Sequence, residues 1–140
     1  MAESYTYTLS SSNKKKWVTL VCTADTDGSF DITLSAAIMN FMAGNYCRCI
    51  KAAPTTDGTA PTNNSDLSIT DSFGVVLMSA SVNGANLIPA ALPALWNYCD
   101  GPLSAGSDYP LVDANYAWTM SVTNNIVNGA DFTLIIELVD

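Results

Sequence analysis

The amino-acid sequence predicts an all-β protein, an antiparallel β-sandwich or jelly roll of about eight strands. Two observations lead to this prediction. Short segments along the chain alternate apolar and polar side chains with a period of two. Turn residues, including Asn-Gly and Asp-Gly pairs, separate these segments at short intervals. The sequence shows no internal repeat and no heptad pattern, so solenoids and coiled coils are not expected.

The first three strands are expected before residue 36. Residues 3–9 alternate tyrosines and a leucine with threonines, which predicts an edge strand, and residues 10–15 predict a polar turn. Residues 17–24 carry Val, Leu and Cys on one face and Trp, Thr and Val on the other, which predicts a strand. An Asp-Thr-Asp-Gly turn then leads to a half-buried strand over residues 30–35.

Residues 36–44 are ambiguous. Ile38, Phe41 and Met42 have helical spacing and Gly44 could end a helix, so either one short helix near 36–43 or an irregular link is expected. A strand is expected at residues 46–52, followed by a loop rich in Thr, Pro, Gly and Asn.

The second half contains the strongest strand patterns. Residues 67–70 and 75–80 flank a tight turn at residues 71–74, which predicts an antiparallel hairpin. Residues 116–123 and 132–139 alternate cleanly around a turn that contains Asn128-Gly129. These two segments complete the expected strands.

Residues 83–110 form an irregular and unusually apolar excursion within an otherwise single domain spanning residues 1–140. Long loops in compact domains are usually functional or disordered. The aromatic and aliphatic side chains here have three possible roles: capping an open end of the core, contacting a protein partner, or binding a sugar through Trp96 and Tyr98. The residues predicted for a protein interface are Leu87, Ile88, Leu92, Leu95, Trp96, Tyr98 and Tyr109.

The charge composition limits the possible partners. Five basic and thirteen acidic residues give a net charge of −8, which disfavours binding to nucleic acid or to an anionic membrane. Charged residues make up 13% of the chain, against about 25% in an average soluble domain. Because so few charges cannot cover an ordinary monomer, we expect part of the surface to be buried against protein partners.

Chemistry at an active site is not expected. The chain has no histidine, which removes the commonest general base and metal ligand, and no carboxylates form a recognisable acid–base pattern. We therefore expect no catalytic residues, no cofactor and no metal. The N-terminal residues lack a signal-peptide pattern and no apolar run is long enough for a transmembrane helix. The protein is expected to stay in the cytoplasm or to leave within a particle released by lysis, with its four cysteines reduced.

Four short patterns have an alternative interpretation. The Asp-Thr-Asp-Gly segment with Asp31 could hold calcium, but it lacks the remaining ligands of an EF-hand and a plain turn is the better account. Cys47 and Cys49, on one face of a strand, could join the other cysteines in a zinc site or a disulfide, although small apolar packing fits better. The lysines at 14–16 could touch DNA or an acidic partner, or form a solvated turn. Asn63-Asn64-Ser65 matches a glycosylation sequon without a secretion signal.

Three segments in order resemble a group of small β-sandwich virion proteins of tailed bacteriophages. They are the Trp strand of residues 17–30 that ends in an Asp-Gly turn, the Ala-Pro-Thr-Asn segment of residues 60–63 followed by Asp-Leu-Ser-Ile-Thr-Asp-Ser-Phe-Gly-Val at 66–75, and the final pair of strands. The likeness covers about half of the chain. The apolar excursion and the C-terminal Glu-Leu-Val-Asp depart from the pattern of that group.

The resemblance implies a structural virion component. We expect a non-enzymatic capsid decoration (cement) protein that is assembled in the host cytoplasm, becomes part of the virion and docks on the major capsid protein or other virion proteins. A homo-oligomer is expected, with a trimer favoured. The alternatives are a tail, baseplate or fibre subunit of a phage, and a carbohydrate-binding module.

Overall fold

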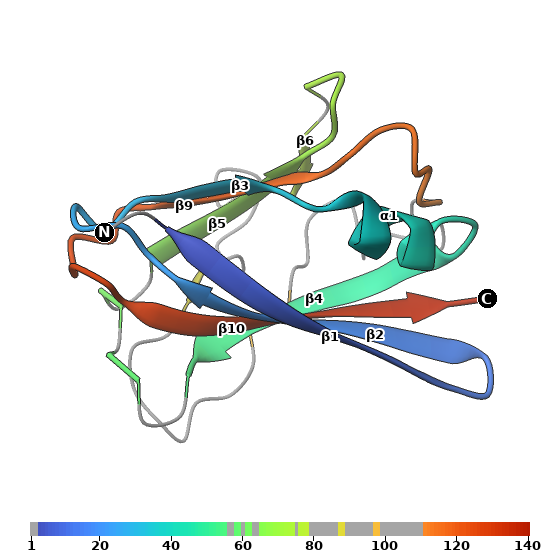
Figure 1. Cartoon of the computed structure of the whole chain (residues 1–140), viewed down its shortest axis with the longest axis horizontal. Helices are drawn as coiled ribbons and strands as arrows, with labels where there is room; N and C mark the ends of the chain where they lie inside the picture. Colours follow the sequence, from blue (N-terminus) through green and yellow to red (C-terminus); the bar gives the residue numbers. More distant parts are fainter. Residues whose placement is uncertain are drawn as a thin grey trace.

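The chain folds as an all-β antiparallel sandwich with one short helix, as the sequence predicts (Figure 1). The computed structural model describes residues 3–55, 58–59, 61–62, 65–74, 76–78, 87–88, 97–98 and 111–140. Within these residues it contains ten strands rather than about eight, because two two-residue strands lie in the 83–110 excursion.

The first sheet has the strand order β1-β2-β10-β4-β8, and the second has the order β3-β9-β5-β6, with β7 also paired to β5. The strands of the first sheet are β1 (Ser4–Ser12), β2 (Lys15–Thr23), β10 (Asp131–Val139), β4 (Tyr46–Pro54) and β8 (Asn97–Tyr98). Those of the second are β3 (Phe30–Thr33), β9 (Thr119–Thr123), β5 (Ser65–Thr70), β6 (Val76–Met78) and β7 (Leu87–Ile88). All the pairings are antiparallel.

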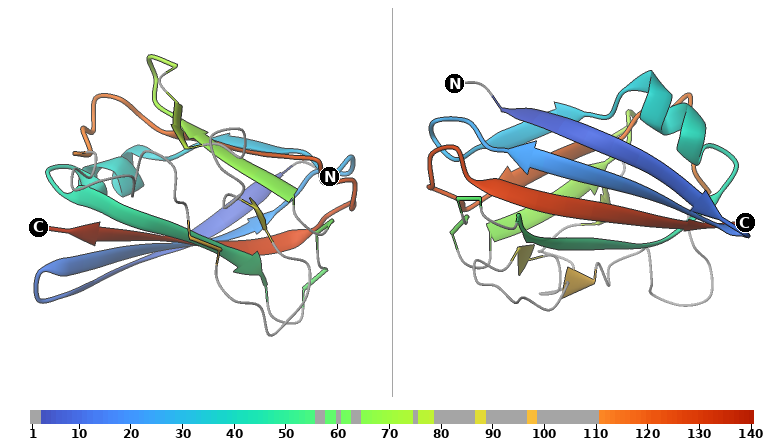
Figure 2. Two further views of the ribbon diagram at one scale, coloured as in Figure 1. Left: turned by 180° about the vertical axis from the view of Figure 1, so that it is seen from behind. Right: turned by 60° about the horizontal axis from the view of Figure 1, so that its bottom comes forward.

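The N-terminal hairpin is longer than the sequence pattern predicts. The strand β1 continues to Ser12 and pairs with β2 along nine residues. The prediction of a turn over residues 10–15 is therefore wrong, because the turn consists of Asn13 and Lys14 alone. Asn13 has a φ of 56°, a left-handed conformation that asparagine tolerates in tight turns. The C-terminal end of β10 lies beside the tip of this hairpin (Figure 2), where the Asp140 N–H donates to the Lys14 carbonyl oxygen at 3.2 Å.

The core lies between the two sheets, where every second side chain points inward. The rings of Phe30 on β3 and Phe132 on β10 meet edge to face across the layers, with centroids 5.0 Å apart and planes at 80°. This geometry is favourable for aromatic pairs. The completely buried residues of the two central strands of the first sheet are Val18, Leu20, Cys22, Phe132, Leu134, Ile136 and Leu138.

The helix α1 (Ala36–Met42) resolves the ambiguity of residues 36–44 in favour of a helix. The Ser35 hydroxyl accepts a hydrogen bond from the Ile38 backbone N–H at 3.4 Å, which caps the N-terminus. Gly44 follows the last turn with a φ of 80°, as is common after a helix. The helix buries Ile38, Met39 and Met42 between the sheets and so closes one end of the sandwich (Figure 1).

The opposite end is closed by a buried side chain that the sequence pattern did not indicate. The Asn125 amide nitrogen donates to the backbone oxygen of Gly28 at 2.9 Å. Its oxygen accepts from the backbone N–H groups of Thr62 at 2.8 Å and Val127 at 3.2 Å. One asparagine therefore joins three separate loops by satisfying backbone groups that would otherwise lack partners.

Candidate functional site

The outer face of the first sheet is the best candidate for a functional surface. The register aligns Thr8 on β1 with Thr19 on β2 and Ile135 on β10, and the next row aligns Thr6, Val21 and Thr133. These side chains alternate with buried core residues, so they point outward. Val21 is 39% exposed. These two rows of the face therefore consist of hydroxyl and apolar groups.

Charged groups lie only at the two ends of this face on β1, β2 and β10. At one end, the Thr23 hydroxyl donates to Asp131 at 2.8 Å. At the other end, Glu137 lies opposite Trp17. No acidic or basic residue occurs between these two rows on the three strands. A partner can therefore cover the middle of the face without stripping water from a charge on these strands.

The outer face of the second sheet differs in chemistry. The Ser121 hydroxyl donates to the Asp31 carboxylate at 3.0 Å, and the hydroxyls of Thr33 and Thr119 are 3.0 Å apart. These side chains form hydrogen bonds with one another, and one of them, Asp31, is an acid. The middle rows of β1, β2 and β10, which carry no acid or base, are therefore cheaper to desolvate than this face.

Glu137 anchors a charge cluster at one end of the outer face. Its side chain is 7% exposed and accepts from Arg48 Nη1 at 2.5 Å, and Lys15 Nζ lies 3.6 Å away. Arg48 reaches it from a bulge, since Glu137 and Leu138 pair with Cys49 and Cys47. At this point one extra residue of β4 stands against β10, which is the definition of a bulge.

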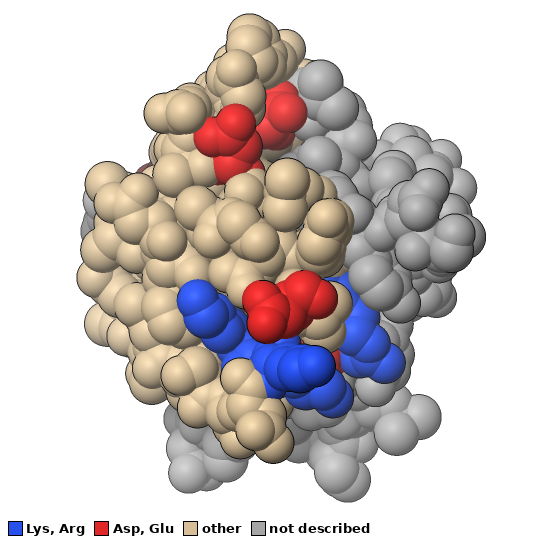
Figure 3. All heavy atoms as spheres, turned by 90° about the vertical axis from the view of Figure 1, so that its right-hand side faces the viewer, with Lys and Arg blue, Asp and Glu red and all other residues tan. Residues whose placement is uncertain are grey.

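All five basic residues of the chain lie between positions 14 and 51. Basic side chains gather at the end of the molecule that carries the β1–β2 turn, around a small acidic area (Figure 3). Lys16 is placed by the helix: its Nζ lies 5.0 Å from the centre of the Phe41 ring and 3.5 Å from the Phe41 carbonyl oxygen. Lys14, Lys15 and Lys16 are adjacent in the sequence, and in the structure Arg48 joins them because it shares Glu137 with Lys15.

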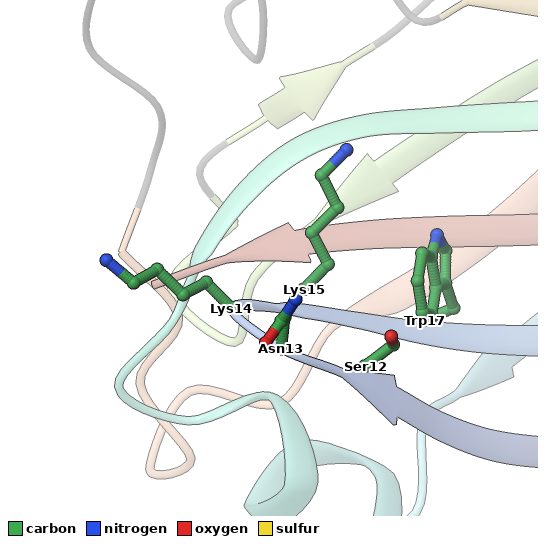
Figure 4. A pocket seen from close by; sticks show the side chains of 5 residues that line it. All are labelled: Ser12, Asn13, Lys14, Lys15 and Trp17. Carbon is green, nitrogen blue, oxygen red and sulfur yellow. The ribbon is translucent and has the colours of Figure 1, made fainter.

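An open pocket of about 640 Å³ lies beside this turn. Among the described residues, Ser12, Asn13, Lys14, Lys15 and Trp17 line it. The side chains of Lys15 and Trp17 rise on the same side of β2, whereas Lys14 points away (Figure 4). Its lining combines two cations with one indole and has no catalytic acid or base among these five residues.

The other end of the first sheet is acidic. The register brings Ser4, Thr23 and Asp131 together, so Glu3 and the Asp25–Gly28 turn lie near this end, far from the β1–β2 turn (Figure 1). Hydrogen bonds from Ser29 to the Asp27 carboxylate hold the pKa of Asp27 below its usual value, so it stays ionised. The molecule is consequently polarised along its strands.

Three of the seven residues predicted for an interface lie within described strands. Leu87 and Ile88 form β7, opposite Asp66 and Ser65, and Tyr98 lies in β8, opposite Lys51. The other four predicted residues, Leu92, Leu95, Trp96 and Tyr109, lie outside the described residues.

Several exposed apolar side chains escaped the sequence analysis. Phe73 is 71% exposed and its ring centroid lies 4.5 Å from that of Tyr116. Its position in the Asp71–Gly74 turn was the available signal, because turn side chains point to solvent. Ile126, in the β9–β10 turn, is 84% exposed. Tyr7 on the edge strand β1 is 42% exposed.

The described acids and thiols offer neither a metal site nor a reactive cysteine. In the described part, no three His, Cys, Asp or Glu side chains form a group that could hold a metal ion. The Asp25 backbone oxygen accepts from Gly28 N–H at 3.0 Å, which is the geometry of a plain turn. Burial raises the pKa of the Cys22 thiol far above its usual range, so this thiol stays protonated and unreactive.

The described helix is too short to cross a membrane. Comparisons with models of known protein families, with characterised proteins and with solved structures find no match to this chain.

Proposed function

We propose that the chain is a non-enzymatic structural protein of a tailed-phage virion that decorates the capsid by docking through the outer face of its first sheet. The observation that carries the proposal is the middle of that face on β2 and β10, where Thr19, Val21, Thr133 and Ile135 lie without an intervening charge. The resemblance of the sequence to small virion proteins supplies the biological setting.

The physical argument concerns desolvation. A face of hydroxyl and aliphatic groups loses little on leaving water, and each hydroxyl can form a hydrogen bond with a partner. Charged residues make up only 13% of the chain, which fits a protein whose surface is partly buried against a partner. The arrangement suits docking better than catalysis, because the middle rows of β1, β2 and β10 present only hydroxyl and apolar side chains.

The mechanism is multivalent attachment. A decoration protein that binds only the assembled capsid stabilises it by mass action, because every bound copy must leave before the shell opens. If copies also contact one another, each docks at a high effective concentration, so weak individual contacts become strong together. The trimer expected from the sequence is the first oligomer to seek.

Labelling of particles tests the location. An antibody against this chain, detected with gold in electron micrographs of the phage that encodes it, is expected to mark the head. Gold on the tail, baseplate or fibres would replace the decoration proposal with the alternative of a tail subunit. The absence of gold from intact and opened particles would contradict a virion role altogether.

A pair of matched variants tests the surface. Val21→Lys places a charge in the middle of the outer face and is expected to reduce binding to purified heads by at least about tenfold. Ile126→Lys makes the same kind of change on a turn away from that face and is expected to leave binding unchanged. Circular dichroism of both variants verifies folding. Equal binding by the two would contradict docking through the first sheet.

A further inference from the structure

The strand β1 is paired on one side only. It forms the end of the first sheet and its single neighbour in the described structure is β2 (Figure 2). The opposite side of its backbone therefore presents unpaired N–H and C=O groups along nine residues. Such an edge is a ready template for another strand.

The edge lacks the features that usually prevent strand addition. Proteins protect edges with charges, prolines, bulges or short strands. The sequence of β1, Ser-Tyr-Thr-Tyr-Thr-Leu-Ser-Ser-Ser, contains no charge and no proline. Its register with β2 is continuous from Ser4 to Ser12, with no bulge.

The hairpin geometry identifies which backbone groups point outward. The two-residue turn makes Ser12 and Lys15 a hydrogen-bonded pair, and hydrogen-bonded pairs then alternate along the strand. Residues in the intervening positions direct their N–H and C=O groups away from β2. These residues are Tyr5, Tyr7, Leu9 and Ser11.

We propose that β1 pairs antiparallel with β1 of a second copy of this chain, centred on Thr8, so that the two first sheets become one continuous sheet. Centring on Thr8 overlaps the whole of Ser4–Ser12 in both copies. The outward-facing groups then form about eight backbone hydrogen bonds, two for each hydrogen-bonded pair. The contact uses the same residues on both sides and is therefore a two-fold interface.

Charge complementarity identifies the occupant as a second copy. In the proposed register, Ser4 of one copy lies opposite Ser12 of the other, which brings Glu3 beside the turn that carries Lys14. The acidic end of each first sheet thus lies beside the basic end of its neighbour, at both ends of the contact. A parallel arrangement would instead place lysines beside lysines, so the charges favour the antiparallel one.

The exposed apolar side chain of the edge is covered in the same arrangement. Tyr7 shares the inward-facing side of β1 with Tyr5 and Leu9, which pack partly against the core, yet Tyr7 remains 42% exposed. In the proposed pair, Tyr7 lies directly opposite Leu9 of the second copy. Aromatic and aliphatic side chains opposite each other stabilise antiparallel strands.

The proposed contact does not depend on the phage assignment, because it rests on the edge of the chain itself. It would join two single copies, or two copies that belong to separate three-fold rings formed through other surfaces. Failure of capsid binding would leave it intact.

Cysteine cross-linking tests both the contact and its register. At a central, non-hydrogen-bonded pair the two Cα atoms lie about 4.5 Å apart, within the range of a disulfide. Thr8→Cys is therefore expected to give a covalent dimer under mild oxidation. Thr6→Cys, on the same face of the same strand, is the matched control, because its two copies would lie about 13 Å apart along the strands. Both variants are made with Cys49 and Cys99 replaced by serine.

The outcomes are distinct. A Thr8→Cys dimer without a Thr6→Cys dimer supports the proposed register. Cross-linking of Thr6→Cys in preference to Thr8→Cys, or of neither, would overturn the proposal. Since both positions are exposed, neither substitution should disturb folding.

Charge exchange supplies a second, non-covalent test. Sedimentation of the unmodified chain is expected to show reversible dimerisation, and Lys14→Glu is expected to weaken it about two- to tenfold. Adding Glu3→Lys to Lys14→Glu restores opposite charges across the contact and should recover most of the loss. A chain that shows no self-association at concentrations on the order of 1 mM, or a double variant weaker than Lys14→Glu alone, would refute the pairing.

Discussion

The Asn125 side chain donates to the backbone oxygen of Gly28, a residue 97 positions earlier in the sequence, at 2.9 Å. The pair joins the β2–β3 turn to the β9–β10 turn, while the same amide also accepts the Thr62 N–H. Because the side chain is only 6% exposed, water cannot replace these bonds without a local opening.

Replacement of Asn125 by alanine is expected to destabilise the fold by about 2–4 kcal/mol, since several buried backbone groups lose their partners together. Urea unfolding followed by tryptophan fluorescence measures the change. Asn115→Ala, at an exposed asparagine, serves as the control and should stay within about 0.5 kcal/mol. Equal effects of the two variants would show that Asn125 does not link the loops.

Gly28 should tolerate no side chain. A Cβ built there would lie 2.3 Å from the Asn125 backbone oxygen, and its φ is 86°. Gly28→Ala is therefore expected to cost more than about 3 kcal/mol, because the clash adds to the strain. Gly44→Ala isolates the strain, since Gly44 has a φ of 80° but open space around it, and should cost about 1–2 kcal/mol. Similar losses in thermal unfolding would contradict the steric argument.

The two cations beside Glu137, Arg48 and Lys15, should contribute unequally to the free energy of unfolding. Glu137→Gln removes the charge that Arg48 contacts at 2.5 Å, and the expected loss is about 1–2 kcal/mol after allowance for the half-exposed guanidinium. Lys15→Ala should change stability by less than about 0.5 kcal/mol, because Lys15 is 52% exposed and 3.6 Å away. Denaturant titrations at low and high salt distinguish them, and a larger loss for Lys15→Ala would be contrary to the geometry.

The buried thiol of Cys22 should make stability fall at alkaline pH. The unfolded thiol ionises near its ordinary pKa of 9.0, whereas burial raises the pKa in the folded state. Its stabilising contribution is therefore complete below pH 9.0 and declines as the pH rises above that value. Cys22→Ala should be less stable than the parent at pH 7 by about 1 kcal/mol, and the difference should shrink at high pH.

Thiol labelling provides an independent measurement for the same residue. A chromogenic disulfide reagent should modify Cys22 only on global unfolding, because the folded thiol is completely buried and protonated. Rapid modification in native buffer, or a pH-independent difference between parent and Cys22→Ala, would contradict this account.

The sequence predicted the local structure well because the physical signals are local. Period-two alternation over residues 132–139 specifies which side chains of β10 face the core, and the structure confirms it. The helical spacing at Ile38 and Met42 allowed a helix as one of two interpretations, and α1 is the one that the structure shows. The hairpin of β5 and β6 followed from the turn at Asp71–Gly74, which the structure places as expected.

The remainder depends on contacts between distant segments. The sequence of β4 does not indicate the bulge at Arg48, because a bulge is defined by how β4 pairs with Glu137 and Leu138 of β10. The role of Asn125 likewise requires three loops to meet. The outer face of the first sheet was not predicted as a surface, because alternation shows which side of a single strand is apolar but not which strands are neighbours. The interface residues predicted at 83–110 remain a prediction.

The place of β10 between β2 and β4 has a consequence for biosynthesis. The central strand of the first sheet is made after both of its neighbours, so β2 and β4 lack their shared pairing partner until residues 131–139 have left the ribosome. The first sheet can therefore be completed only after residues 131–139 have been made. Until that moment, the strands already made expose their apolar faces, and this interval is when chaperones have most to protect.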